Sequence, residues 1–505
     1  MTTPQPPLDP QQQAEHNTKT HSKVYTGSAF MLVTRIGIKS IGLISSIVLA
    51  RLLVPEDFGL VAIAMAIYAF IELFGALGLG TVLIQNQSND TDDYNTAWTF
   101  KVLFGLVSAS AMALAAPYVA EFYADPRLDN VIYVIALASI LSGAANIGVV
   151  NFQKDMDFRK ELKYQLVPKI ISFVITLTLA FVYRNYWALV IGMVSNQFII
   201  LLFSYWMHPF RPRFGLKSFN KLFSFSRWLL LNNVLFYLND KFSELIVGRL
   251  LSPSAVGLFA IGKEIAHLPT MEMAKPINKA TFPVYSRFKD NFTELRKAYL
   301  NTVALTASLT MPAALGIALI APLFVEVVLG DKWLPAAPLI QLLALSSMLT
   351  SLTVNNSYIY MACGKPNIMF LINLIRTVMF FAFFIPLLDL NGIVGIGQAR
   401  LSTTLIMLFG AQIAVVLFLK LQVLPLLGVF LRPTLACMVM GGAVLLIQQA
   451  DWVPVQGLSL LMQIIAGGLS YTLVSLLLWR WQGYPEGLER TVVERLYPGY
   501  LQGKV

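Results

Sequence analysis

Four basic side chains lie inside long apolar stretches of this sequence: Arg35, Lys39, Arg376 and Arg400. An ammonium or guanidinium group attracts anions strongly where water is scarce, because little solvent screens its charge. Arginine can also form two parallel hydrogen bonds to a phosphate or a carboxylate. Lys39, Arg376 and Arg400 have no acidic residue within one helical turn along the chain. These four residues are therefore predicted to bind an anionic ligand in a polar cavity.

Three acidic side chains also lie in apolar stretches: Glu72, Asp240 and Glu244. A carboxyl group at such a position can take up and release an ion during transport, so all three are candidates for coupling to a proton or sodium gradient. The other interpretation, open for Asp240 and Glu244, is structural. They would then pair with Lys241 or Lys263 and hold helices together.

The composition of the chain places these charges in a membrane. Of its 505 residues, 56% are hydrophobic and only 13% are charged, and the mean hydropathy is +0.66. Soluble domains carry about 25% charged residues, and a chain this apolar could not cover its surface with polar groups. A charge at the centre of a spanning helix costs about 3 kcal/mol, so these side chains are expected to face one another or a water-filled cavity.

Fourteen apolar runs are long enough for spanning helices, which need about 20 residues each. The alternation typical of a membrane β-barrel is missing from the sequence, so the predicted fold is an all-α integral membrane protein. The runs cover residues 28–50, 58–84, 97–117, 129–150, 165–183, 186–207, 225–250, 255–279, 299–320, 335–361, 367–387, 391–419, 427–447 and 457–480. The short apolar segment 322–329 is expected to be re-entrant or interfacial.

The connections between these runs differ in charge, which predicts an orientation. Lysine and arginine gather in residues 151–164, 208–224 and 280–298 and in the C-terminal tail, whereas the intervening connections are nearly bare. By the positive-inside rule, the basic connections and both termini are predicted to be cytoplasmic. The net charge of +10 then needs no nucleic-acid partner. The polar first 23 residues contain no apolar core of a signal peptide.

One short turn occurs twice in the sequence. Residues 51–63 read RLLVPEDFGLVAI and residues 249–261 read RLLSPSAVGLFAI, with eight of thirteen positions identical at an offset of 249 − 51 = 198. Arg51 and Arg249 would each end a span, and Pro55 and Pro253 would open the next, where a missing N–H is harmless. Two parallel six-helix repeats are therefore predicted, an arrangement that typically encloses a substrate site.

The predicted organisation follows from the runs, the charges and the repeat. It consists of a disordered cytoplasmic tail (1–24), an N-lobe with spans 1–6 (25–207), a cytoplasmic linker (208–224), a C-lobe with spans 7–12 (225–420), spans 13 and 14 (421–482) and a cytoplasmic tail (483–505).

Patterns for catalysis are weak in this sequence. Asp155 and Asp157 form a DxD triplet, which many glycosyltransferases use to hold a metal and a nucleotide sugar, but it lies in a short basic loop with no globular domain around it. The sequence has no Walker A motif for ATP and no His/Cys spacing for a metal. Cys363 and Cys437 stand far apart in apolar runs and suggest no disulfide framework. We expect no cofactor, no metal and no enzymatic activity.

Four segments resemble one group of membrane exporters. ARLLVPEDFGLVAIA at 50–64 and LGLGTVLIQN at 77–86 resemble the opening signature of the polysaccharide-transporter branch of the multidrug/oligosaccharidyl-lipid/polysaccharide exporter superfamily. NFQKDMDFRKEL at 151–162 and TFPVYSRFKDNFTELRKAYL at 281–300 resemble the basic cytoplasmic loops of those proteins after spans four and eight. The resemblance covers about residues 25–480 and is greatest to Wzx-type flippases similar to colanic acid exporters.

This resemblance implies a fold and a function. The fold would be fourteen helices, with two six-helix lobes around a central cavity. The function would be to move an undecaprenyl-pyrophosphate-linked oligosaccharide across the bacterial inner membrane by alternating access. Implied partners are this lipid-linked substrate, the bilayer, a polysaccharide polymerase and a chain-length regulator. The resemblance supplies no site that transfers residue by residue, so the site prediction rests on depth and charge.

Two alternative functions stay open at this point. A multidrug or organic-ion antiporter could share the fold, although its site should be apolar and acidic, unlike the basic residues found here. A membrane polysaccharide polymerase or lipid-linked glycosyltransferase usually displays a sizeable outer loop with catalytic residues. Every predicted outer connection in this chain is short, which argues against such an enzyme.

Overall fold

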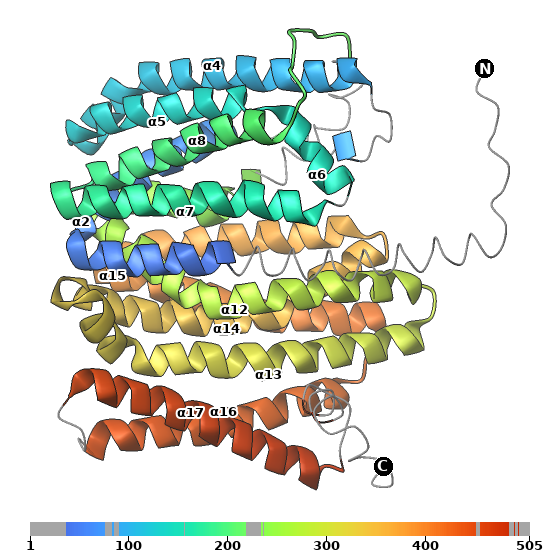
Figure 1. Ribbon diagram of the computed structural model, residues 1–505. Coiled ribbons are helices and arrows are strands. Elements are labelled where there is room, and N and C mark those ends of the chain that lie inside the picture. Colours follow the sequence, from blue (N-terminus) through green and yellow to red (C-terminus); the bar gives the residue numbers. More distant parts are fainter. Residues whose placement is uncertain are drawn as a thin grey trace, which may run out of the picture. The chain divides into compact units, whose positions relative to one another are not determined.

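The computed structural model describes residues 37–75, 83–84, 90–155, 157–218, 234–235, 237–450, 455–483, 489 and 493. Throughout these residues the regular elements are helices and no strand occurs (Figure 1). Nine helices in this part of the chain are long and apolar enough to cross a membrane. The prediction of an all-α membrane protein is confirmed. The predicted tail 1–24 and Arg35 lie outside the described residues, as do parts of the predicted spans 28–50, 58–84 and 225–250.

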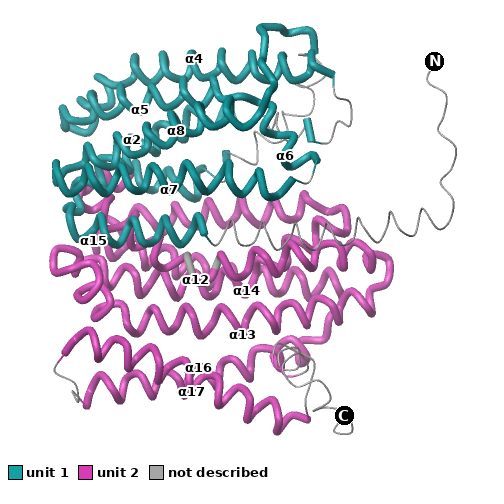
Figure 2. The backbone as a smooth tube through the Cα atoms, viewed as in Figure 1, with its two compact units in different colours: residues 1–245 teal, residues 246–505 magenta. Residues whose placement is uncertain are grey.

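The chain divides into two compact units, residues 1–245 and 246–505 (Figure 2). The division falls inside helix α11 (Phe242–Leu250). In unit 1, residues 37–52 are helical. The other elements of unit 1 are α2 (Pro55–Glu72), α4 (Thr91–Tyr123), α5 (Arg127–Ala144), η1 (Ile147–Val149), α6 (Val150–Lys154), α7 (Phe158–Tyr183) and α8 (Trp187–Met207). Helix α4 packs along α5, α7 packs along α8, and α5 also packs against α8.

Unit 2 is a second helical bundle. Its elements are α12 (Pro253–Arg287), α13 (Phe292–Phe324), η2 (Val325–Leu329), η3 (Asp331–Ala336), α14 (Ala337–Ala362), α15 (Pro366–Leu419), α16 (Val423–Ala450) and α17 (Gln456–Trp481). Helix α14 packs against α12, α13 and α15, while α16 packs against α13 and α17. The segment 322–329 was expected to be re-entrant or interfacial. It is not re-entrant, because it continues α13 and ends in a π-helical turn, and its interfacial location stays a prediction.

Helix α15 contains a sharp reversal between its two legs. Gly392 has φ 54° and ψ −135°, a backbone conformation that favours glycine because it lacks a Cβ. The second leg then packs directly on the first, since a Cβ at Gly395 would lie 1.8 Å from the carbonyl oxygen of Leu387. The predicted runs 367–387 and 391–419 are therefore two legs joined at this kink.

The repeated turn starts a helix in both units. Helix α2 begins at Pro55 and α12 at Pro253, each with proline in the first turn. The two helix starts are capped differently. At α2, Asp57 Oδ2 accepts from the backbone N–H of Val54 at 3.1 Å. At α12, Ser252 Oγ accepts from the backbone N–H of Ala255 at 3.2 Å. The repetition of whole lobes stays a prediction.

A cluster of charged residues joins three turns of unit 1. Arg127 Nη2 lies 2.5 Å from Glu56 Oε1 and 2.7 Å from Asp125 Oδ2. Asp57 Oδ1 accepts from the backbone N–H of Tyr186 at 3.0 Å. The hydrogen bond from Arg127 lowers the pKa of Asp125 below its usual value of 3.8. The first copy of the turn thus ties α2 to the α4–α5 and α7–α8 turns.

The connection after α8 runs along the start of α4, and its residues 208–218 are called the strap below. Three backbone N–H groups of the strap donate to side chains of the first turns of α4. Arg213 donates to Asn95 at 2.8 Å, Gly215 to Thr99 at 3.0 Å and Ser218 to Thr96 at 3.2 Å. The described part of the predicted linker 208–224 is therefore bound to unit 1.

Candidate functional site

Two of the predicted basic residues, Arg376 and Arg400, lie on the two legs of α15. Because the kink folds one leg against the other, the guanidinium carbon of Arg400 lies 4.2 Å from the centroid of the Phe380 ring. Phe380 is 1% exposed. Arg376 and Phe380 are four residues apart on the first leg and so share a face of the helix. The kink thus brings the guanidinium of Arg400 against a buried aromatic ring of the leg that carries Arg376.

Arg376 has donor capacity that the described protein does not use. Its side chain is half-buried, and its Nε atom is buried without a hydrogen bond to any described residue. A buried N–H group without a partner is destabilising by about 1–3 kcal/mol, and more when the group is charged. Water or an anionic ligand at this position would relieve that cost.

Lys39 belongs to unit 1 and lies on an exposed face of the helical residues 37–52. Arg51 and Arg249 are exposed at the ends of the helices that precede the two repeated turns. Convergence of Lys39 with Arg376 and Arg400 on one cavity stays a prediction.

Glu72 lies at the end of α2 in a polar site that the sequence predicted only in part. Ser108 Oγ donates to its carboxylate at 3.3 Å, and Ser139 Oγ lies 3.3 Å from that of Ser108. Lys101 of α4 interacts electrostatically with the same carboxylate. Lys101 was missed, although a basic residue inside the apolar run 97–117 is the same signal that singled out Lys39.

Glu244 is fully buried and paired within its own helical turn. Lys241 Nζ lies 3.1 Å from both of its carboxylate oxygens. Asp240 is half-buried beside this pair. Separating a buried carboxylate from its cation costs about 3–5 kcal/mol, because an unpaired charge is left in the interior. The geometry therefore favours the structural interpretation for Glu244.

The DxD triplet has a local explanation. Asp157 caps α7, since its side chain accepts from the backbone N–H of Lys160 at 3.2 Å and lies 2.9 Å from Lys160 Nζ. That interaction lowers the pKa of Asp157 below its usual value. Aspartate at this position stabilises a helix start without any metal.

A polar seam in unit 2 escaped the sequence-based site prediction. Tyr299 OH donates to Asn356 at 2.8 Å, and Ser351 Oγ donates to Thr310 at 2.8 Å. These contacts join α13 to α14, as expected of hydroxyl and amide groups between membrane helices. The signal is the recurrence of neutral polar residues every three to four positions along both helices.

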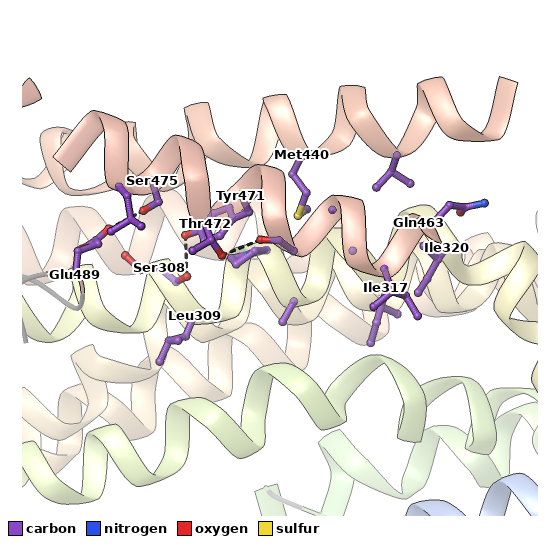
Figure 3. Close-up of a pocket in the computed structure, with 18 residues that line it drawn as sticks. Ser308, Leu309, Ile317, Ile320, Met440, Gln463, Tyr471, Thr472, Ser475 and Glu489 are labelled. Atoms are coloured by element: carbon purple, nitrogen blue, oxygen red, sulfur yellow. Dashed lines mark hydrogen bonds between the residues drawn. The ribbon is translucent and has the colours of Figure 1, made fainter. Parts of the chain in front are cut away.

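A groove of about 600 Å³ lies between α13, α16 and α17 (Figure 3). Its walls are mostly apolar, and Gly316 and Gly468 widen it because a Cβ at either position would meet open space. Ser475 and Glu489 lie together at one end of the groove (Figure 3).

These features define a multi-pass helical membrane protein with acidic and basic side chains held among its helices. Residues 48–338 match the family of polysaccharide biosynthesis proteins, and this match covers more than half of the chain. The chain therefore belongs to the polysaccharide biosynthesis protein family.

Named relatives support the same family. The lipopolysaccharide biosynthesis protein WzxC of Escherichia coli (strain K12) is 25% identical over 374 residues, which are 73% of this chain and 75% of that protein. The succinoglycan biosynthesis transport protein ExoT of Rhizobium meliloti (strain 1021) is 22% identical over 301 residues, which are 59% of this chain and 61% of that protein. The resemblance to Wzx-type transporters is confirmed.

A solved structure supports the fold. The lipid II flippase MurJ, in an inward closed conformation, matches with a TM-score of 0.70 over 90% of this chain and 99% of its own, at 14% identity. At that identity the likeness shows the fold alone.

Proposed function

We propose that this protein is a flippase that moves a lipid-linked oligosaccharide or polysaccharide repeat unit across the bacterial inner membrane. The membership of residues 48–338 in the polysaccharide biosynthesis family carries the proposal. The names of WzxC and ExoT, and the fold shared with a lipid II flippase, support it. It is a transporter and not an enzyme.

The substrate of such a flippase joins a lipid to a sugar through phosphate, so its head needs cationic donors. Arg376 and Arg400 are proposed to bind this anionic head, together with Lys39 and Arg35. The unused Nε of Arg376 supports this role. The ring of Phe380 lies against the guanidinium of Arg400, and arginine suits phosphate recognition because its planar group can stack on an aromatic ring and also form bidentate hydrogen bonds.

Glu72 and Asp240 are proposed to couple transport to a proton or sodium gradient. Glu72 suits this role because the serine hydroxyl of Ser108 and the ammonium group of Lys101 both act on its carboxyl group. Glu244 is the weaker candidate because Lys241 already neutralises it.

We also propose a detailed architecture for this flippase. It comprises fourteen spans, two six-helix repeats that alternate access, and both termini in the cytoplasm. A polysaccharide polymerase and a chain-length regulator would act beside the flippase on the same lipid-linked units.

The test is complementation of a strain in which the gene for this protein is deleted. We expect the strain to accumulate lipid-linked oligosaccharide on the inner leaflet, and the wild-type gene to restore export. Arg376→Gln and Arg400→Gln should each lower export about tenfold or more, the effect of losing a hydrogen bond to a charged group. Arg480→Gln, at an exposed arginine in the last turn of α17, is the matched control.

Two outcomes would contradict the proposal. One is normal export from both arginine variants at wild-type levels of folded membrane protein, which removes the site assignment. The other is resistance to cationic dyes on overexpression with no change in lipid-linked sugar, which favours an antiporter of organic ions.

A further inference from the structure

A chain of two hydrogen bonds links α14 to the backbone of Arg400 in the second leg of α15. Thr404 Oγ1 donates to the carbonyl oxygen of Arg400 at 2.7 Å. Ser346 Oγ of α14 lies 2.9 Å from the same Thr404 hydroxyl. A threonine hydroxyl carries one hydrogen, which is directed at Arg400 here, so Ser346 is the donor in the second bond. The chain of donors therefore runs from Ser346 through Thr404 to Arg400.

Both hydroxyl groups of this chain are buried. Ser346 is 5% exposed and Thr404 is 9% exposed. A buried hydroxyl that loses its partner keeps the full cost of its desolvation, so sliding of the second leg along α14 is opposed. Hydroxyl pairs of this kind hold neighbouring helices together in membranes, where apolar burial between helices gives little.

The second leg of α15 meets α14 along one face. Gly397, Thr404 and Ala411 are spaced seven residues apart and so share that face. At one end, a Cβ on Gly397 would lie 2.8 Å from Cβ of Leu342, so the two backbones approach closely there. At the other end, the carbonyl oxygen of Ala411 accepts from Asn356 Nδ2 at 3.1 Å. The contact extends over 411 − 397 = 14 residues, about 21 Å of helix.

A second polar link fastens the same two helices farther along. Gln412 Nε2 donates to the carbonyl oxygen of Leu352 in α14 at 3.3 Å. Tyr299 OH of α13 lies 2.8 Å from Asn356 Oδ1 and 3.2 Å from Gln412 Oε1. Helices α13, α14 and the second leg of α15 are thus joined at this level, and the register of the second leg is fixed at two places.

Arg400 lies inside this fastened stretch. It follows Gly397 by three residues and precedes Thr404 by four, so contacts with α14 flank it on both sides. Its guanidinium rests on the ring of Phe380 in the first leg, whereas its backbone is held from α14. A slip of the second leg by one turn would displace Arg400 by about 5.4 Å. A binding group must be held within about 0.5 Å to keep its geometry.

We propose that Ser346 and Thr404 are positioning residues, which fix the backbone of Arg400 so that its guanidinium can bind the anionic head of the substrate. Helix α14 has no charged residue between Ala337 and Ala362, so it acts on this site through position and not through charge. The inference rests on the proposed function, because the substrate contact of Arg400 is assigned there. Neither hydroxyl has to touch the substrate.

The test measures transport of the lipid-linked oligosaccharide into proteoliposomes against substrate concentration. Thr404→Val keeps the shape of the side chain and removes the hydroxyl. It should raise the half-saturation concentration about two- to tenfold, the effect of one lost hydrogen bond, and leave the maximal rate nearly unchanged. Thr404→Ser keeps the hydroxyl and should restore the wild-type value. Ser346→Ala should raise the half-saturation concentration as well. The double variant should add little, because both changes break one chain.

Thr434→Val on α16 is the matched control. The hydroxyl of Thr434 donates to the carbonyl oxygen of Phe430 at 2.7 Å, in the same way as that of Thr404 to Arg400. Because α16 lies outside the two legs of α15, this variant should leave the half-saturation concentration unchanged.

A second measurement reports the position of the second leg without any transport. Spin labels on Met361→Cys and Leu417→Cys, in a chain without Cys363 and Cys437, mark the ends of α14 and of the second leg. Met361 and Leu417 are 46% and 72% exposed, so labels fit there. Thr404→Val should broaden the distribution of distances between the labels, and Thr434→Val should not.

Three results would overturn the proposal. They are a wild-type half-saturation concentration for Thr404→Val, an equal rise for Thr434→Val, or a rise for Thr404→Val without a broader distance distribution. A deletion strain that accumulates no lipid-linked oligosaccharide would contradict the proposed function instead. The distances between the spin labels need no substrate, so they test the fastening of the second leg separately.

Discussion

Arg400 shows how an aromatic ring can hold a charge inside a membrane protein. Its guanidinium lies over the buried ring of Phe380, which attracts the cation through its negative face. A guanidinium stacked on a ring directs its N–H donors along its own plane and not toward the ring. Phe380 is therefore expected to set the orientation of a group that we propose to bind the substrate.

Replacing Phe380 by leucine should weaken substrate binding without removing a charge. The cation–π contact contributes about 0.5–2 kcal/mol, so the apparent affinity for the lipid-linked substrate should fall about two- to thirty-fold. Transport measured against substrate concentration in proteoliposomes would show this as a raised half-saturation concentration.

Phe384→Leu is the matched control for this prediction. Phe384 is 0% exposed and packs against Phe380, with ring centroids 5.1 Å apart. Replacing the Phe384 ring by leucine creates a similar cavity but leaves the contact between Arg400 and Phe380 in place. An equal effect of both variants would mean that packing, and not the contact with Arg400, matters.

At the scale of elements, the strap depends on a neutral histidine. His208 Nδ1 accepts from the backbone N–H of Phe210 at 3.2 Å. Space is tight, since a Cβ on Gly148 would lie 2.4 Å from the same ring nitrogen. Burial lowers the pKa of His208 below its usual 6.5, and the positive charges of Lys160 and Arg211 act in the same direction, while Asp155 opposes them.

This shift predicts that the strap loosens in acid. Because the folded-state pKa is lowered, the unfolded chain takes up the proton first. The contribution of neutral His208 to the stability of the strap is therefore complete above about pH 6.5. It is lost as pH falls from there toward the folded-state pKa of His208. Hydrogen exchange at the backbone N–H groups of residues 210–218, corrected for intrinsic rates, should accelerate between about pH 7 and pH 5.

His208→Asn keeps an acceptor near the same position but does not titrate. Exchange in this variant should change little over that pH range. If the variant and wild type showed the same acceleration, another group would be responsible.

The ends of the helices were less predictable than their existence. The sequence predicted a connection over 280–298, but α12 extends to Arg287 and α13 begins at Phe292. Asn291 caps α13 by accepting from the backbone N–H groups of Thr293 and Glu294, at 3.2 and 3.3 Å. An apolar run marks the hydrocarbon core, whereas a helix ends where its caps are, and here these differ by several residues.

At the scale of the whole molecule, the asymmetry of basic residues predicts the orientation. Single cysteines at Ser22 and Gln502, in a chain without Cys363 and Cys437, would test it. In intact cells an impermeant maleimide should label neither site, and it should label both after permeabilisation, because both termini are expected in the cytoplasm.

A control cysteine at Asn185, in the short α7–α8 turn, should be labelled in intact cells. Labelling of either tail before permeabilisation would contradict the predicted topology, because it would place that terminus outside the cytoplasm.

The sequence by itself determined the membrane class, the all-helical fold and the family, because apolar run length and the turn at Pro55 are local properties of the chain. It also indicated Arg376 and Arg400 as costly charges. Only the tertiary structure decided their surroundings. The pairing of Arg400 with Phe380 depends on the reversal at Gly392, and that of Arg432 with Glu489 joins residues 489 − 432 = 57 positions apart. Such contacts follow from packing, which no periodicity along the chain encodes.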